Sequence, residues 1–141
     1  MEAKEQNYGV VGEHEAAAAM GARDERTWSA LAHLSIFLNL ITGFLGPVAA
    51  FIVWLVYRDR SSMVAFQALQ SMWYQVGWLA ILFAGWTVTG LLTVILIGFL
   101  LIPVMAVISL VPFAHGAYAA YRVNRDGEYR YPLVADLIER R

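Results

Sequence analysis

The fold is decided by residues 61–121, which read SSMVAFQALQSMWYQVGWLAILFAGWTVTGLLTVILIGFLLIPVMAVISLVPFAHGAYAAY. This stretch contains no Asp, Glu, Lys or Arg. A charged side chain costs several kcal/mol at the centre of a bilayer, so a charge-free stretch of this length is typical of membrane-crossing segments. It is long enough for two spans of about 20 residues each. The sequence therefore predicts two transmembrane helices, at about residues 63–89 and 91–121, joined by an uncharged link around residues 85–92.

Residues 28–57 form another stretch without acidic or basic side chains other than histidine. As one helix it would be about 45 Å long, against a hydrocarbon core of roughly 30 Å. Gly43 and Pro47 interrupt it, and proline is favoured at the start of a helix rather than in its interior. We therefore expect two short helices, residues 28–41 and 47–57, that pair as a hairpin. A single tilted and kinked span is the alternative.

The composition agrees with a membrane protein. The chain has 141 residues, of which 60% are hydrophobic and 15% are charged, whereas a soluble domain has about 25% charged residues. A formal net charge of -1 argues against nucleic acid as a partner, because that binding needs clustered Lys and Arg. The absence of cysteine excludes disulfides and thiolate metal sites. We expect one all-α integral membrane protein in contact with the lipid bilayer.

The charged residues fall in three groups, residues 1–26, 58–60 and 122–141. We expect a flexible cytoplasmic N-terminal tail at residues 1–26, a helical membrane domain at residues 27–121 and a cytoplasmic tail after it. With a hairpin, all three groups lie on one side of the membrane, and the Lys/Arg bias makes that side cytoplasmic. With a single span, residues 1–26 lie on the opposite side. The predicted location is a bacterial-type cytoplasmic (inner) membrane or a specialised intracellular membrane, with a multi-pass chain and a cytoplasmic C-terminus.

The C-terminal tail predicts a short amphipathic helix after Pro132. Its apolar residues share one helical face, the pattern of a helix that lies in the membrane interface. Tyr129 and Tyr131 suit the aromatic belt at the headgroup level. His115 is interpreted as an interfacial residue near the end of its helix. The apolar residues of the amphipathic face are Leu133, Val134, Leu137 and Ile138.

A polar stripe runs along the first predicted transmembrane helix. At 100° per residue its members fall within about 100° of one another, so they share one face that should not point at lipid. We expect this face to bind a neighbouring helix, and we expect His33 to be its partner across the interface. Lining of a small polar groove is the alternative. The stripe consists of Gln67, Gln70, Ser71, Tyr74 and Trp78.

His33 is the only titratable group of the first apolar stretch apart from the terminal Tyr57. An ionisable residue in a membrane segment suggests function, and an imidazole can ligate haem or relay protons. The simpler interpretation is a neutral histidine hydrogen-bonded across helices. Gly116 and Ala120 have the small-xxx-small spacing that lets helices approach closely, either within the chain or at a contact with a partner.

No catalytic residue, cofactor site or metal site is predicted. The sequence has no phosphate-binding glycine loop, no nucleophile elbow, no paired histidines at zinc spacing and no acidic pair in a membrane segment. An enzyme would need at least one such arrangement. We therefore expect a protein that is not an enzyme.

Several stretches between residues 25 and 138 resemble a family of small bacterial membrane proteins related to the plastid inner-envelope import component Tic-twenty, which includes the magnetosome proteins MamF and MmsF. The stretches that carry the resemblance are Glu25-Arg26-Thr27-Trp28, Ala32-His33-Leu34-Ser35, Leu45-Gly46-Pro47, Val53-Trp54-Leu55, Arg58-Asp59, Ser62-Met63-Val64, Gln67-Ala68-Leu69-Gln70 and Gly127-Glu128-Tyr129-Arg130-Tyr131-Pro132-Leu133. The resemblance implies a membrane protein of three or four helices that works as part of an assembly.

Three functional hypotheses follow. The first is a non-catalytic accessory or scaffold subunit, which packs with other integral membrane proteins or with itself. The second is a transport or translocation component like the plastid import protein that the resemblance suggests. The third is a pigment- or haem-associated subunit that binds through His33.

Overall fold

The structure, a computed structural model, describes residues 20–139, so most of the predicted N-terminal tail lies outside the described residues. All regular structure in this part of the chain is helical, which confirms the all-α prediction. The elements are α2 (Ala22–Leu34), the 3-10 turn η1 (Ser35–Phe37), α3 (Leu38–Thr42), α4 (Leu45–Tyr57), α5 (Ser62–Thr93), α6 (Ile97–Asp126) and α7 (Val134–Glu139).

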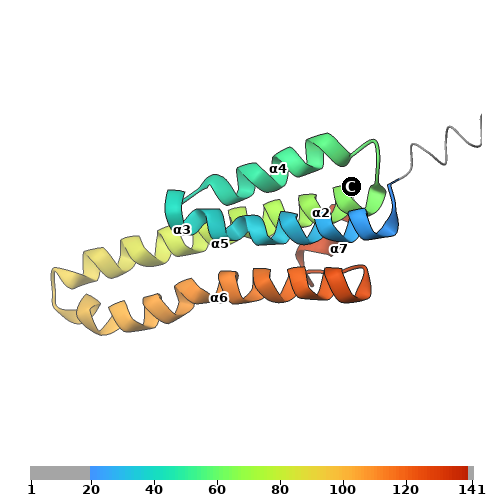
Figure 1. The fold of residues 1–141 in the computed structure, drawn as a ribbon. Coiled ribbons are helices and arrows are strands. Elements are labelled where there is room, and N and C mark those ends of the chain that lie inside the picture. The colour runs from blue at the N-terminus through green and yellow to red at the C-terminus, as the bar shows by residue number, and fades with distance from the viewer. Residues whose placement is uncertain (1–19, 140–141) are drawn as a thin grey trace, which may run out of the picture.

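Helices α5 and α6 form a long antiparallel pair (Figure 1). Both are long and apolar enough to cross a membrane, which confirms the prediction of two such helices. Only 6% and 11% of their most apolar 18-residue windows are buried inside the protein. Because the core helix of a soluble protein would be mostly buried, this low burial is typical of helices that face lipid.

The link between α5 and α6 lies at residues 94–96, several residues beyond the expected position. Helix α5 continues through Gly90. An unpaired backbone N–H or C=O group is costly where water is absent, and a continuous helix pairs these groups. The turn uses a left-handed residue, Leu96, with φ of 65°. Its N–H donates to the Thr93 carbonyl at 3.0 Å. The turn therefore pairs this N–H group without water.

The first apolar stretch is a hairpin, and the alternative of one kinked span is wrong. The chain reverses at Gly43, whose φ of 82° suits glycine. Asn39 fixes the reversal because its Oδ1 accepts a hydrogen bond of 2.7 Å from the Gly46 N–H. Helix α2 begins at Ala22 rather than Trp28, so the first arm is longer than expected.

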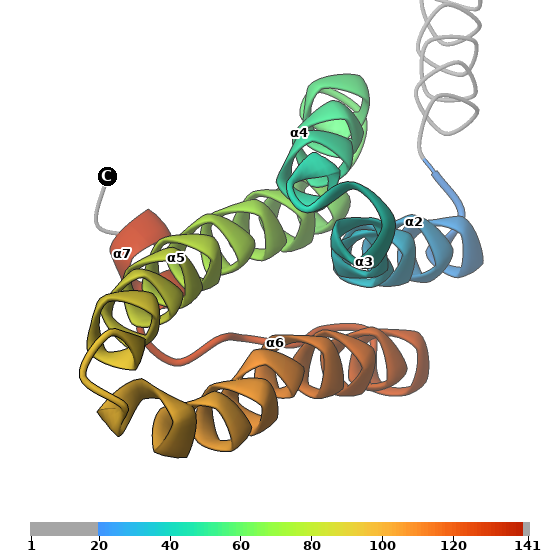
Figure 2. The ribbon, with the colours of Figure 1, turned by 90° about the vertical axis from the view of Figure 1, so that its left-hand side faces the viewer.

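Both arms of the hairpin pack against α5. Helix α2 packs against both α5 and α6, whereas α4 packs mainly against α5 (Figure 2). Ser61 caps the start of α5 by accepting a hydrogen bond of 3.2 Å from the Val64 N–H. Its hydroxyl also donates to Glu25 Oε1 at 2.5 Å, which ties the start of α5 to α2.

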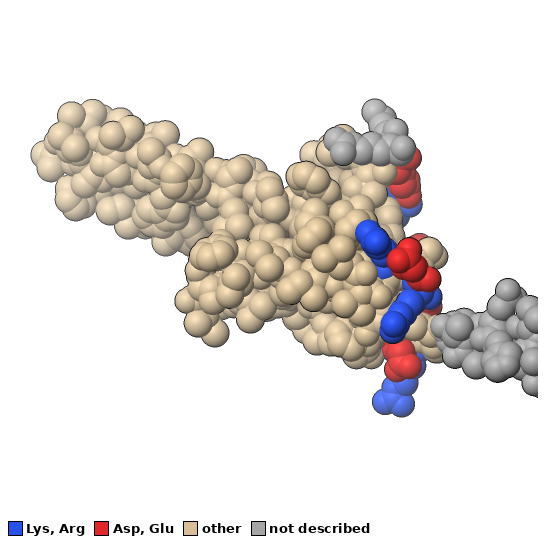
Figure 3. Space-filling view, turned by 90° about the horizontal axis from the view of Figure 1, so that it is seen from above, with Lys and Arg blue, Asp and Glu red and all other residues tan. Residues whose placement is uncertain are grey.

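The hairpin covers only one half of the long pair (Figure 1). We call residues 83–111 the distal arm and the remaining described residues the proximal domain. The acidic and basic side chains gather at the proximal end, and the face of the arm seen in Figure 3 is free of them. The predicted C-terminal helix is present as α7, which packs against α5 at the proximal end.

Candidate functional site

The polar stripe of α5 faces the interior of the proximal domain. Its buried members lie against α2, α6 and the segment that precedes α7, away from the lipid-facing surface. Gln75, which was not among the predicted members, belongs to the same face. An extension of the i, i+4 series from Gln67 through Ser71 identifies it. The buried members are Gln67, Gln70, Ser71, Tyr74 and Gln75.

His33 lies against Gln67 in the centre of this domain. Its Nε2 is 2.9 Å from Gln67 Oε1, and its side chain is fully buried. Gln67 Oε1 also accepts a hydrogen bond of 3.3 Å from Gln70 Nε2, so this oxygen is an acceptor and His33 Nε2 carries the proton. His33 Nδ1 then accepts from the Tyr131 hydroxyl at 3.3 Å. Both ring nitrogens are engaged by protein groups.

Gln70 binds the backbone of the C-terminal segment. Its Nε2 donates to the Tyr129 carbonyl at 2.7 Å, and its Oε1 accepts from the Tyr131 N–H at 2.8 Å. One side-chain amide thus satisfies two backbone groups, as a neighbouring strand would. The prediction that Tyr131 belongs to a headgroup belt is wrong. Its side chain is 2% exposed and stacks on Tyr74, with ring centroids 4.0 Å apart and an interplanar angle of 10°.

Ser71 and Gln75 continue the contact with α2 toward the tip of the hairpin. The Ser71 hydroxyl donates to the Ala32 carbonyl at 2.8 Å. Gln75 Nε2 donates at 3.0 Å both to Ser35 Oγ and to Ser71 Oγ. Because α2 and α5 are joined at several levels, the hairpin arm is held in one register.

His115 lies between two phenols. Its Nδ1 is 2.8 Å from the Tyr74 hydroxyl and its Nε2 is 2.6 Å from the Tyr129 hydroxyl. The expectation that His115 lies near a helix end is wrong, because α6 continues to Asp126. Burial raises the pKa of Tyr129 beside His115 and of Tyr131 beside His33, so both of these phenols are protonated at neutral pH.

Gly116 and Ala120 pack inside the chain, where α6 crosses the first arm of the hairpin. A Cβ on Gly116 would lie 2.9 Å from Ile36 Cγ2 and 3.3 Å from the His33 carbonyl oxygen. The Ala120 side chain is buried. These small residues allow α6 to approach α2 closely.

The arrangement is chemically a hydrogen-bonded polar core. It joins the three helices α2, α5 and α6 and the C-terminal segment through amides, imidazoles and hydroxyls. Within residues 20–139, no three His, Asp or Glu side chains gather where they could hold a metal ion. Ligation of haem or pigment by His33 stays a prediction, and it would require replacement of the Gln67 or Tyr131 contact.

Comparison with known proteins gives one match. The model of the magnetosome magnetite crystal formation protein family (MamF/MmsF) matches residues 24–138, which include both arms of the hairpin and the polar core. The search of curated proteins and the search of solved structures found no match. The findings support the MamF-like part of the resemblance and give no support to the part that relates the chain to Tic-twenty. The chain therefore belongs to the magnetosome magnetite crystal formation protein family, a family of magnetosome membrane proteins.

Proposed function

We propose that this protein is a non-catalytic scaffold of a magnetosome-type membrane, in which the proximal domain holds the fold and the distal arm contacts other membrane helices. The family match supports a role in magnetite crystal formation. On this proposal, the chain contributes to crystal formation by organising proteins in the membrane. The C-terminus lies on the cytoplasmic side.

The observation that carries the proposal is the distribution of polar groups. Most polar side chains of the buried α5 stripe bind other parts of the same chain, such as Gln70 on the C-terminal backbone. The outer surface of the arm, by contrast, is apolar and exposed, as at Phe83 (77%) and Leu100 (77%). An apolar surface without charge has two kinds of partner in a bilayer, lipid and other membrane helices.

The experiment is site-specific crosslinking in the native membrane. The sequence has no cysteine, so a single introduced thiol is unique. Phe83→Cys and Leu100→Cys place it on the arm, and Asp59→Cys on the proximal loop is the matched control. A thiol-to-thiol crosslinker tests contact with a second copy, and a thiol-to-amine crosslinker tests contact with other proteins. We expect defined crosslinked products from the arm positions and fewer from Asp59→Cys.

Magnetite crystals provide the functional readout. A strain without this protein should form crystals of altered size, and the native chain should restore them. Polar substitutions of similar size, such as Leu100→Gln, should fold, because the polar core is unchanged, yet restore crystals poorly. Normal crystals with an arm variant that has lost all of its crosslinks would contradict the scaffold proposal.

A further inference from the structure

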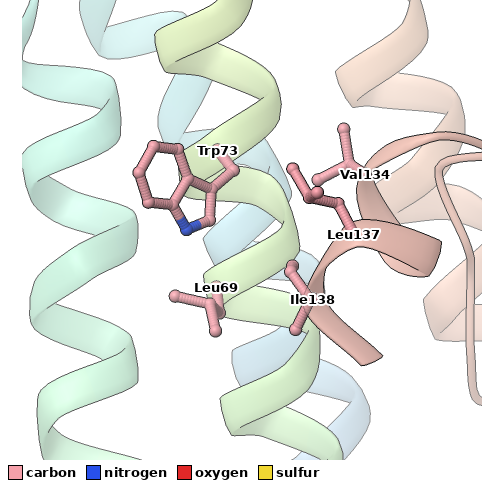
Figure 4. Close-up of a pocket in the computed structure, with 5 residues that line it drawn as sticks. All are labelled: Leu69, Trp73, Val134, Leu137 and Ile138. Atoms are coloured by element: carbon pink, nitrogen blue, oxygen red, sulfur yellow. The ribbon is translucent and has the colours of Figure 1, made fainter. Parts of the chain in front are cut away.

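An apolar groove lies between α5 and α7 at the charged end of the molecule. Its volume is about 310 Å³, at the lower limit of the roughly 300–1,000 Å³ of ligand pockets. Leu69 and Trp73 of α5 line one side, and Val134, Leu137 and Ile138 of α7 line the other (Figure 4). Trp73 is 46% exposed and Leu137 is 62% exposed, so the groove is open to its surroundings.

A group of three charged side chains stands beside the groove. Arg130 Nη2 is 2.7 Å from Glu139 Oε2 and 3.7 Å from Asp136 Oδ1. The Arg130 guanidinium lies over the Phe66 ring, 5.8 Å from its centroid, and Phe66 is one turn before Leu69 on α5. Glu139 directly follows the groove residue Ile138. The charged group therefore lies within one helical turn of groove residues on both α5 and α7.

We propose that this groove binds one acyl chain of a phospholipid with a phosphoethanolamine headgroup. The acyl chain occupies the surface between Trp73 and α7. The phosphate faces Arg130, and the ammonium faces Asp136 and Glu139. This inference does not depend on the scaffold role, because a lipid site is compatible with any function of the chain.

The charges select the headgroup. One cation and two carboxylates make the group negative overall, so an anionic headgroup such as phosphoglycerol meets repulsion. A phosphocholine headgroup has no N–H to donate to a carboxylate. Phosphoethanolamine carries one phosphate charge and three N–H donors, so it complements both kinds of side chain at once.

Tryptophan quenching by brominated lipids tests the proposal. The protein is reconstituted in vesicles with equal fractions of brominated phosphatidylethanolamine, phosphatidylcholine or phosphatidylglycerol, and fluorescence is compared with that of Trp73→Phe. The difference between the two quenching values measures the quenching of Trp73, which lines the groove. We expect phosphatidylethanolamine to quench Trp73 with a preference of about two- to fivefold, the size that one exposed ion pair provides.

Trp86 on the distal arm is the matched control, because its side chain is similarly exposed (41%) and far from the charges in sequence and along α5. The Trp86→Phe variant should keep the lipid preference, and Trp73→Phe should lose it. Arg130→Gln combined with Glu139→Gln should also abolish it, with a helical circular dichroism spectrum as the check of folding. Equal quenching by the three lipids would overturn the proposal. Shielding of Trp73 from all lipids would overturn it too, and would indicate a protein in the groove.

Discussion

The proximal domain and the distal arm are held together by different interactions. In the proximal domain, side chains bind across elements, as in the Gln70 bonds to the C-terminal backbone. In the arm, most hydroxyls bind their own helix, as Thr89 does with the Gly85 carbonyl at 2.9 Å. The hydrogen bond between arm helices runs from Trp86 Nε1 to Ser109 Oγ, at 3.1 Å.

This difference follows from the surroundings of each half. The proximal domain must hold the reversal of a hairpin together with a C-terminal segment without regular structure. Both leave backbone groups to be paired: Gln70 pairs two of the C-terminal segment, and Asn39, Ser35 and Ser71 pair others in the hairpin. The arm needs close packing of two complete helices, which small residues supply. Polar substitutions should therefore affect the proximal domain, and changes of size should affect the arm.

The largest effect is expected from Gln70→Met, which keeps the shape of the side chain. It leaves the Tyr129 carbonyl and the Tyr131 N–H without partners. We expect the free energy of unfolding to fall by about 2 to 6 kcal/mol, since each of the two unpaired groups costs about 1 to 3 kcal/mol. Unfolding by SDS from a mild detergent, followed by tryptophan fluorescence, measures the change.

The control for this variant is Val76→Met, which places the same side chain at an exposed position of α5. Its stability should be close to that of the native chain. Gln70→Met should also make the bond after Arg130 more sensitive to trypsin, because the segment is released from α5. Equal stability of the two variants would refute the role assigned to Gln70.

Glycine substitutions in the arm should have opposite signs. A Cβ on Gly98 would overlap the backbone of Thr89 and Thr93, whereas a Cβ on Gly90 would meet open space. We expect Gly98→Ala to lower the free energy of unfolding by about 1 to 3 kcal/mol through overpacking. Gly90→Ala should raise it by up to about 1 kcal/mol, because alanine favours the helix. The same SDS titration measures both, and a loss of stability with Gly90→Ala would contradict this account of arm packing.

The sequence was most informative where one residue type decides the outcome. The lack of charge in residues 61–121 predicted the long pair, and Gly43 marked the reversal of the hairpin. The polar stripe of α5 was expected to have His33 as its partner, and the structure places His33 Nε2 at 2.9 Å from Gln67 Oε1. In these cases, one physical constraint leaves few alternatives.

The sequence was least informative where distant segments meet. Tyr131 in sequence looks like an interfacial tyrosine, and its burial depends on Gln70, 61 residues away along the chain. The α5–α6 turn lies at residues 94–96 rather than within residues 85–92, because a bilayer favours continued backbone pairing through Gly90. The hydrogen bonds of His115 to Tyr74 and Tyr129 could not be predicted either, because they exist only after distant segments of the chain pack together.

A smaller effect is expected from Trp86→Phe, which removes the hydrogen bond to Ser109 and keeps most of the ring. Hydrogen bonds between membrane helices contribute about 0.6 kcal/mol on average. We expect a loss of about that size in the SDS titration, well below the loss for Gln70→Met. Phe83→Leu, also on the exposed arm surface, controls for lost aromatic area. A loss comparable to that of Gln70→Met would remove the distinction between the two halves.

The smallest effect concerns pH, and it should be confined to the proximal end. The hydrogen bond from Arg130 lowers the pKa of Glu139 below its ordinary value of 4.5. A carboxylate with a lowered pKa in the folded state stabilises that state above its ordinary pKa, and this contribution is lost as the pH falls through the lowered value. The attachment of α7 should therefore weaken as the pH falls below the ordinary glutamate pKa of 4.5, while the fluorescence of Trp86 in the arm stays constant. A carbon-13 NMR titration of the Glu139 carboxyl measures its pKa. In Arg130→Gln this pKa should return toward 4.5. It should also do so at high salt, because the ion pair is exposed and salt screens it. A Glu139 pKa that is unchanged in Arg130→Gln would show that the ion pair does not fix α7.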